Sequence, residues 1–252
     1  MIRAEPADAP GAGTRFAPSR WSAGRVGVGL VLAAWAGLFW FLLESGRWSL
    51  YLSTRTSWLV PVGAVLLSVA ALGRLASARV RHHPEPLTAR QTWTIGLLAL
   101  PVVVVLALPP AALTSFAVGR RSGFVGAGVS ASTEDIATGS LTLIDVAAAQ
   151  TSTDGLRALE ARAGERVSFD GFVMRFADTP ADEILLTRYI VTCCVADATV
   201  AQVRVVGVPA GRFEEDQWVR VTGTIIPLGR EVLVEAGDVV GISRPDRPYL
   251  TP

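Results

Sequence analysis

Three long stretches without a charged residue most constrain what this chain can fold into. Arginine or glutamate bounds each stretch, and they cover residues 26–43, 56–73 and 91–119. About 20 helical residues cross the roughly 30 Å hydrocarbon core of a bilayer, where a helix bonds all of its own backbone polar groups. A buried core helix is the alternative for each stretch, but three in succession favour a membrane anchor of three spans over residues 25–119.

Prolines interrupt the third stretch at Pro101, Pro109 and Pro110. Proline removes a backbone donor and clashes with the preceding helical turn. We therefore expect the third helix to kink at Pro101 and to stop near Pro109. Two more spans follow the first stretch and no small-residue cleavage site stands out near it, which disfavours a cleaved signal peptide.

The arginines are distributed unevenly around these stretches. Residues 1–25 and 74–90 each carry four of them, whereas the loop between the first two stretches has only Arg47 and Arg55 beside Glu44. Cytoplasmic loops are enriched in arginine and lysine. The sequence therefore predicts a multi-pass membrane protein with a cytoplasmic N-terminus and an extracytoplasmic C-terminal domain. The leader, residues 1–24, is rich in alanine, proline and glycine and is predicted to be disordered.

The two halves of the chain carry opposite net charge. Residues 1–120 contain 11 arginines and 4 acidic residues, a net charge of +7, and residues 121–252 contain 12 arginines and 18 acidic residues, a net charge of −6. A domain that binds nucleic acid presents a basic face to the phosphates. The acidic C-terminal half thus argues against nucleic acid as a partner.

Residues 120–150 begin with a stretch rich in glycine, serine and alanine and are predicted to form a linker, with a short strand over 141–146. A short helix is expected over 153–160, which opens at a residue suited to capping and ends before Gly164. Beyond it, apolar side chains recur every second residue, which predicts strands over 165–174, 184–194, 203–208, 218–226 and 231–242.

Five short strands with even spacing are typical of a small closed barrel of the OB type. Glycines fall inside the first and fourth strands, and Gly171 is predicted to mark a bulge or a bend. The predicted fold is thus a three-span helical membrane anchor followed by an extracytoplasmic, OB-like all-β domain over residues 151–252. A β-sandwich is the alternative for this domain.

The chain contains two cysteines, Cys193 and Cys194, which are adjacent at the end of the second predicted strand. Successive side chains of a strand point to opposite faces, so the two thiols converge only if the strand ends or bulges there. A disulfide between them is disfavoured, because consecutive Cα atoms lie about 3.80 Å apart and most bridges need roughly 4.4–6.8 Å.

Three interpretations of these cysteines stay open. They are two small buried residues, since cysteine is among the most buried residue types. Alternatively, they bind zinc, copper(I) or another soft metal ion, with Asp197 as an oxygen donor. The third interpretation is a strained, redox-active vicinal pair. The candidate metal ligands are therefore Cys193, Cys194 and Asp197, and because zinc usually takes four ligands, a subunit or partner protein would supply the rest.

No catalytic constellation stands out in the C-terminal half. It contains no histidine, which removes Ser-His-Asp and Cys-His catalysis, and no phosphate-binding loop. Carboxylates such as Asp182 and Glu183 are adjacent and expected to be exposed. We therefore expect no catalytic residues and no enzymatic activity.

Four segments give the chain a resemblance to a known family. They are Ala107-Leu108-Pro109-Pro110, Gly171-Phe172-Val173, the run 188–198 around the two cysteines, and the run 216–223. Through them the chain resembles the YcgQ-type family of bacterial membrane proteins, which are described as permease subunits. The resemblance covers most of residues 25–250, and its most specific part is Thr-Cys-Cys followed by Ala-Asp-Ala.

The resemblance implies a location in the bacterial cell membrane, an extracytoplasmic domain, and a multi-span permease of the YraQ type as partner. It supplies no substrate. The predicted function is an accessory subunit of a membrane permease, held in the lipid bilayer, whose outer domain handles a thiophilic metal ion through the two cysteines. The alternatives are an envelope thiol-redox protein and a structural docking module with buried, inert cysteines.

Overall fold

The computed structural model describes residues 20–80, 88–108, 113–115, 117–118 and 131–252. The chain divides into two compact units, which we call the helical unit (residues 1–38 and 63–106) and the barrel unit (residues 39–62 and 107–252). Most of the predicted disordered leader lies outside the described residues. Its last residues are ordered as strand β1 (Arg20–Trp21), which pairs with β2 (Arg79–Val80).

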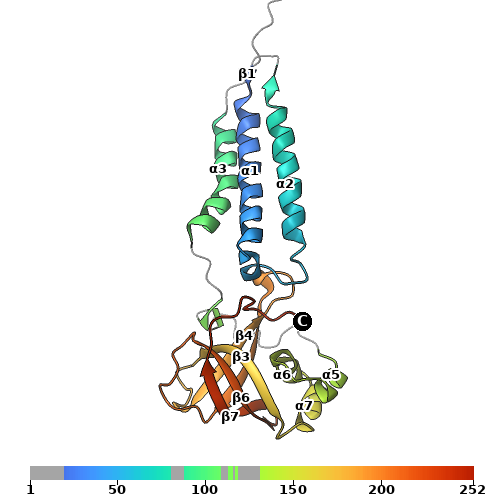
Figure 1. Cartoon of the computed structure of the whole chain (residues 1–252), viewed down its shortest axis with the longest axis vertical. Coiled ribbons are helices and arrows are strands. Elements are labelled where there is room, and N and C mark those ends of the chain that lie inside the picture. Colours follow the sequence, from blue (N-terminus) through green and yellow to red (C-terminus); the bar gives the residue numbers. More distant parts are fainter. Residues whose placement is uncertain (1–19, 81–87, 109–112, 116, 119–130) are drawn as a thin grey trace, which may run out of the picture. The chain divides into compact units, whose positions relative to one another are not determined.

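Three long apolar helices are present, as predicted: α1 (Ala23–Glu44), α2 (Leu59–Ala76) and α3 (Ala89–Ala107) (Figure 1). Each is long and apolar enough to cross a membrane. Pro101 lies inside α3, which ends just before Pro109. Leu66, Leu72 and Leu97 leave 63%, 68% and 66% of their surface exposed. Because exposed apolar surface costs free energy in water, the helix faces need lipid or other helices to cover them.

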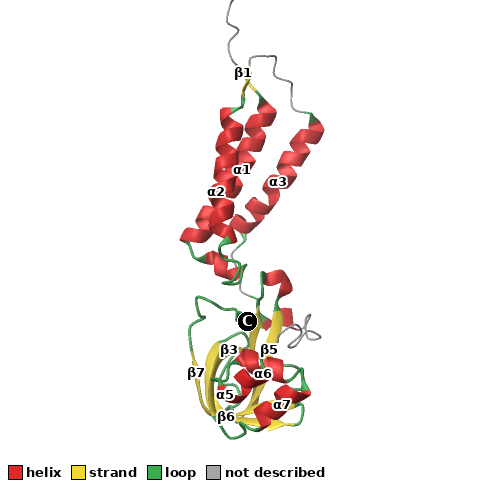
Figure 2. Cartoon of the chain, turned by 90° about the vertical axis from the view of Figure 1, so that its right-hand side faces the viewer, coloured by secondary structure: helices red, strands yellow, loops and turns green. Residues whose placement is uncertain are grey.

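Five strands close into a barrel in the order β3-β4-β5-β7-β6. They are β3 (Arg166–Met174), β4 (Glu183–Ile190), β5 (Thr199–Val206), β6 (Trp218–Leu228) and β7 (Glu231–Gly241) (Figures 1 and 2). Neighbouring strands are antiparallel except for β5 and β7, which are parallel. The OB-like barrel is confirmed, and the β-sandwich alternative is wrong because β3 pairs with both β4 and β6 and closes the sheet.

Two apolar clusters hold the barrel together. The first fills its interior with the inward side chains of all five strands, such as Ile184, Val203 and Val221. The second covers the outer face of β3 and β4, where Phe172 stacks on Tyr189 with their ring centroids 5.8 Å apart. This second cluster explains why β3 begins with alternating burial but is buried on both faces in its last four residues.

Two glycines let neighbouring strands approach closely. A Cβ atom at Gly171 would lie 2.8 Å from the carbonyl oxygen of Thr187, and one at Gly223 would collide with the carbonyl oxygen of Glu235. Of the bulge or bend predicted at Gly171, the bulge is wrong, since β3 and β6 keep their register through this position. The register shift lies instead in β6, between Thr222 and Gly223.

Three short helices precede the barrel strands in the chain: α5 (Thr133–Thr138), α6 (Leu143–Ala149) and α7 (Thr153–Glu160). Figure 1 shows them gathered at one side of the barrel, where α6 packs on β5 and α7 on β6. The helix over 153–160 was predicted correctly.

The strand predicted over 141–146 is wrong, because this segment begins helix α6. Thr142 and Asp145 form a capping box at its start, in which each side chain bonds the other residue's backbone N–H. Val146 and Ala149 are fully buried and join the barrel core. The second half of the predicted linker therefore belongs to the folded domain, while residues 119–130 lie outside the described part of the chain.

Candidate metal centre

Strand β4 ends before it reaches the two cysteines. The sequence predicted a strand continuing to Cys194, but pairing with β5 stops at Ile190. Beyond that point the partner of the chain is the C-terminal segment, residues 242–252. The backbone N–H of Val191 donates to the carbonyl of Leu250 at 2.9 Å. The chain then turns through residues 191–194, which we call the cysteine turn, into the short 3₁₀ helix η3 (Val195–Asp197).

The carboxylate of Asp197 fixes the backbone of this turn. Its Oδ1 accepts the N–H of Thr192 at 2.9 Å, and its Oδ2 accepts the N–H groups of Cys193 at 2.8 Å and Cys194 at 3.2 Å. Hydrogen bonds to an ionised acceptor are about twice as strong as neutral ones. One side chain thus fixes three consecutive peptide groups and with them the direction of both thiols.

The strand end brings the two thiols together. Their Sγ atoms are 3.7 Å apart, and these atoms and a carboxylate oxygen of Asp197 all lie within 4.8 Å of one another. Two thiolates on a tetrahedral zinc ion, each at about 2.3 Å, would have sulfurs about 3.8 Å apart. The three residues predicted as ligands are therefore adjacent in space, and the two sulfurs have the spacing of a shared ion.

The thiols are also accessible. Cys193 is exposed and Cys194 is partly exposed. The interpretation of two buried packing residues is therefore wrong for this chain. The two sulfurs are better placed to bind an ion than the carboxylate, because three of the four lone-pair positions of Asp197 already accept backbone N–H groups.

The Asp197 carboxylate favours the protonated form of the Cys193 thiol. A hydrogen bond to the Asp197 carboxylate is the largest cause that raises the pKa of Cys193 from 9.0 to about 11, and a hydrogen bond to Cys194 is the second. For Asp197 itself, burial opposes ionisation, but hydrogen bonds from the Cys193 thiol and the three backbone N–H groups outweigh it and lower its pKa. A bound cation would reverse this balance, since a coordinated thiol loses its proton.

The loop between α1 and α2, residues 45–58, holds the cysteine turn from the other side. The N–H of Ser53 donates to the carbonyl of Cys193 at 3.1 Å, and its hydroxyl donates to the carbonyl of Thr192 at 2.7 Å. The Thr56 hydroxyl donates to the Cys193 carbonyl at 2.6 Å. Ser53 is 3% exposed, so this contact is buried. The 45–58 loop and the barrel must therefore lie on the same side of any membrane that the helices cross.

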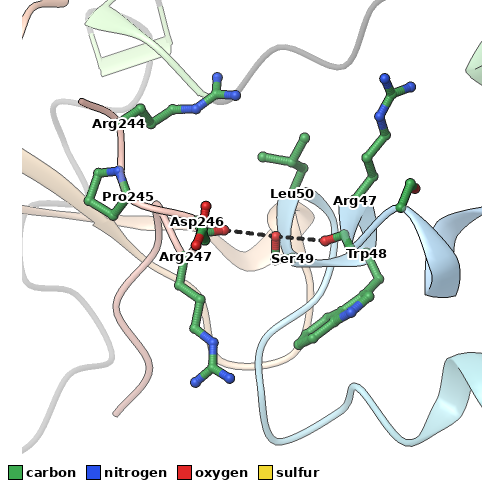
Figure 3. A pocket seen from close by; sticks show the side chains of 10 residues that line it. Arg47, Trp48, Ser49, Leu50, Arg244, Pro245, Asp246 and Arg247 are labelled. Atoms are coloured by element: carbon green, nitrogen blue, oxygen red, sulfur yellow. Dashed lines mark hydrogen bonds between the residues drawn. The ribbon is translucent and has the colours of Figure 1, made fainter.

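The same loop also contacts the C-terminal segment, which supports the end of β4. The Ser49 hydroxyl donates to the carbonyl of Asp246 at 3.0 Å, beside a pocket of about 500 Å³ between the two segments (Figure 3). Three arginines line this pocket: Arg47, Arg244 and Arg247. The loop therefore supports the cysteine turn both directly and through the C-terminal segment.

Sequence reasoning identified the three candidate ligands but missed Ser53 and Thr56. The available signal was weak: hydroxyl residues are unusually dense in the short run Ser53-Thr54-Arg55-Thr56-Ser57. Nothing in that run indicates a partner about 140 positions further along the chain.

A comparison with protein families places the candidate site within a recognised domain. Residues 135–251 match the model of the DUF1980 C-terminal domain, a description that names no activity. No curated protein sequence matches the chain. The match runs from helix α5 to the C-terminal segment and includes the cysteine turn. The part of the chain that carries the candidate metal centre is thus similar to the DUF1980 C-terminal domain.

Proposed function

We propose that the chain is an accessory subunit of a bacterial membrane permease, and that its cysteine turn handles a soft metal ion such as zinc or copper(I). The observation that carries the metal proposal is the pair of exposed thiols with sulfurs 3.7 Å apart on a turn fixed by Asp197. Thiolates select soft ions, and this spacing suits two of them on one ion.

The site would hold its ion as cargo rather than as a permanent part of the fold. Structural zinc sites are closed by four protein ligands. Here Cys193 and Cys194 supply two sulfurs and Asp197 a nearby negative charge, which leaves positions open for a ligand from another protein. Binding also requires loss of the thiol protons, so the raised pKa of Cys193 makes release easier as the pH falls.

The thiol-redox alternative has less support. Reactive cysteines sit in electropositive surroundings that lower their pKa. Cys193 lies beside the Asp197 carboxylate, which raises its pKa to about 11. A thiol in this state is a slow nucleophile at neutral pH.

The permease partner is supported by the exposed apolar faces of α2 and α3 and by the resemblance of the chain to permease subunits. Side chains such as Val69 and Trp93, exposed by 63% and 80%, give other membrane helices a surface to pack on. By the arginine distribution, the barrel unit would meet the permease on the extracytoplasmic side.

The metal proposal is tested on the full chain, purified under reducing conditions without oxygen. We expect about one equivalent of zinc or copper(I) per chain, measured by elemental analysis after dialysis against a weak chelator. The double variant Cys193→Ser, Cys194→Ser should lose it, and Ser168→Ala, which removes an exposed hydroxyl on β3, should keep it. Equal metal content in the cysteine variant and the unchanged protein would contradict the proposal.

The partner is tested separately, by co-expression with a tagged YraQ-type permease and purification in mild detergent. The permease should recover the full chain in a fixed ratio, and it should also recover the cysteine double variant, because assembly does not need the thiols. Isolation of the chain as a monomer without the permease would contradict the subunit proposal and leave the metal result standing.

A further inference from the structure

The helical unit contains a second pocket, of about 540 Å³, at the end where α1 and α3 begin and α2 finishes. Arg25 of α1, Arg74 of α2 and Arg90 of α3 line it. Its wall is apolar where Val28, Ile95 and Leu98 contribute. The pocket therefore joins a strongly cationic part to a hydrophobic one.

No carboxylate balances these arginines among the described residues of the helical unit, since 20–38, 63–80 and 88–106 contain no aspartate or glutamate. Arg25 has a role in the structure, because its Nη1 donates to the carbonyl of Ser77 at 2.7 Å. Like charges in one small pocket repel each other unless an anion lies between them. The charge pattern thus calls for a negatively charged ligand.

Helix packing defines the shape of the pocket. A Cβ atom at Gly27 would lie 2.9 Å from Cδ1 of Ile95, so glycine is what lets α1 come close to α3 here. Further along, the indole N–H of Trp35 donates to the carbonyl of Leu98 at 2.9 Å, and at the open end the N–H of Ser22 donates to the carbonyl of Ala78. Contacts between all three helices therefore build the pocket.

We propose that this pocket binds the phosphate group of an anionic phospholipid. Arginine bonds phosphate oxygens through its fork of N–H donors, and Arg74 and Arg90 are exposed and able to reach such a group. The apolar wall would contact the first carbons of the acyl chains. A basic pocket between transmembrane helices is suited to a lipid head group on the side of the membrane where arginine is enriched.

The test uses the full chain in a neutral detergent and native mass spectrometry, which counts bound lipids. Phosphatidylglycerol and phosphatidylcholine of equal chain length are the probes. The variant is Arg74→Gln with Arg90→Gln, which leaves the structural bond of Arg25 intact. Its matched control is Arg157→Gln with Arg166→Gln, which removes the same charge from exposed positions of the barrel unit.

We expect retention of phosphatidylglycerol over phosphatidylcholine. Each arginine near a phosphate is worth about fivefold in affinity, so the Arg74, Arg90 variant should bind phosphatidylglycerol on the order of 30-fold more weakly. The control should bind it as the unchanged protein does.

A competition arm with inorganic phosphate identifies the source of the anion. Retention of lipid in its presence supports a phospholipid, and displacement of the lipid shows that free phosphate can take the same site. Equal binding of the two lipids, or equal binding by the Arg74, Arg90 variant and the control, would overturn the proposal.

Discussion

At Asp197, one carboxylate has two effects on its neighbours. It fixes the backbone by accepting the N–H groups of Thr192, Cys193 and Cys194, and its hydrogen bond to the Cys193 thiol raises the pKa of that thiol. The first effect orders the two sulfurs, and the second keeps Cys193 unreactive while no cation is present. Geometry suited to a metal ion is thus combined with protection from chemical attack.

This combination predicts slow alkylation of Cys193. With a pKa raised from 9.0 to about 11, the thiolate fraction at pH 8 is about 100-fold smaller than in an ordinary exposed cysteine. In a Cys194→Ser background, iodoacetamide should therefore react at least tenfold more slowly with the folded than with the denatured protein. Because the shift is upward, the rate should keep rising with pH until the pKa of Cys193 is reached.

Asp197→Asn is the companion variant, since it removes the carboxylate whose hydrogen bond raises the pKa of Cys193. Alkylation at pH 8 should become faster in it, and mass spectrometry of the modified peptide follows the rate. Fast alkylation of Cys193 at pH 7 in the unchanged protein would indicate a depressed pKa and restore the thiol-redox interpretation.

At the scale of elements, local sequence patterns predicted most of the helices and strands. The three long helices follow from long runs without charged residues, helix α7 from its capping residue and the glycine beyond its end, and the five barrel strands from apolar residues at every second position. The closed barrel was predictable from the number and spacing of the strands.

Elements that depend on distant or side-chain contacts were not predictable in this way. Residues 141–146 were predicted to form a strand, but the capping box of Thr142 and Asp145 starts a helix there. Strand β4 stops before Cys193 because Leu250 and Asp197 take over its backbone hydrogen bonds. The sequence analysis did anticipate that the two thiols would converge if the strand ended or bulged at the cysteines, and the strand ends there.

Close strand packing at the register shift of β6 makes Gly223 sensitive to substitution. An added Cβ in Gly223→Ala would meet the backbone of Glu235 and, at 2.9 Å, a methyl group of Val234. Overpacking of this kind costs about 1–3 kcal/mol. We expect a lower thermal midpoint for unfolding of the barrel unit. Circular dichroism of the full chain in detergent measures this midpoint.

The matched control is Gly73→Ala, because Gly73 lies in helix α2 with open space around it. Alanine there should leave stability unchanged or raise it slightly, since alanine is the better helix former. A Gly223→Ala protein as stable as this control would contradict the close approach of β6 and β7.

At the scale of the whole molecule, the barrel unit is assembled from segments that are far apart in the chain. The Tyr189 hydroxyl donates to the carbonyl of Thr114 at 2.8 Å, and the N–H of Ser115 donates to Asp216 at 2.7 Å. The 45–58 loop adds its bonds to the cysteine turn. Residues 121–252 alone would therefore lack the contacts made by Thr114, Ser115 and the 45–58 loop, so experiments on the site require the full chain.

The loop contact predicts how the cysteine turn responds to its loss. Ser53→Ala with Thr56→Val removes two hydroxyls that donate to the turn, and each such hydrogen bond contributes about 1 kcal/mol. Hydrogen exchange at the backbone amides of residues 192–194 should become several-fold faster or more. Mass spectrometry of the exchanged peptides measures this.

Ser57→Ala is the control, because the Ser57 hydroxyl donates to the carbonyl of Thr54 within the loop itself. Exchange in the cysteine turn should stay at its original rate in this variant. If the Ser53, Thr56 variant exchanged no faster than the control, the loop would not support the turn.

The distance in sequence between the loop and the cysteine turn also sets an order of events during synthesis. Ser53 leaves the ribosome 139 residues before Thr192, the residue whose carbonyl it bonds. At about 5–20 residues per second, the interval is roughly 10–30 s, during which the hydroxyls of Ser53 and Thr56 have no cysteine turn to bond. The site is completed only after the cysteine turn itself has been made, so a chain interrupted before that point carries the anchor without the site.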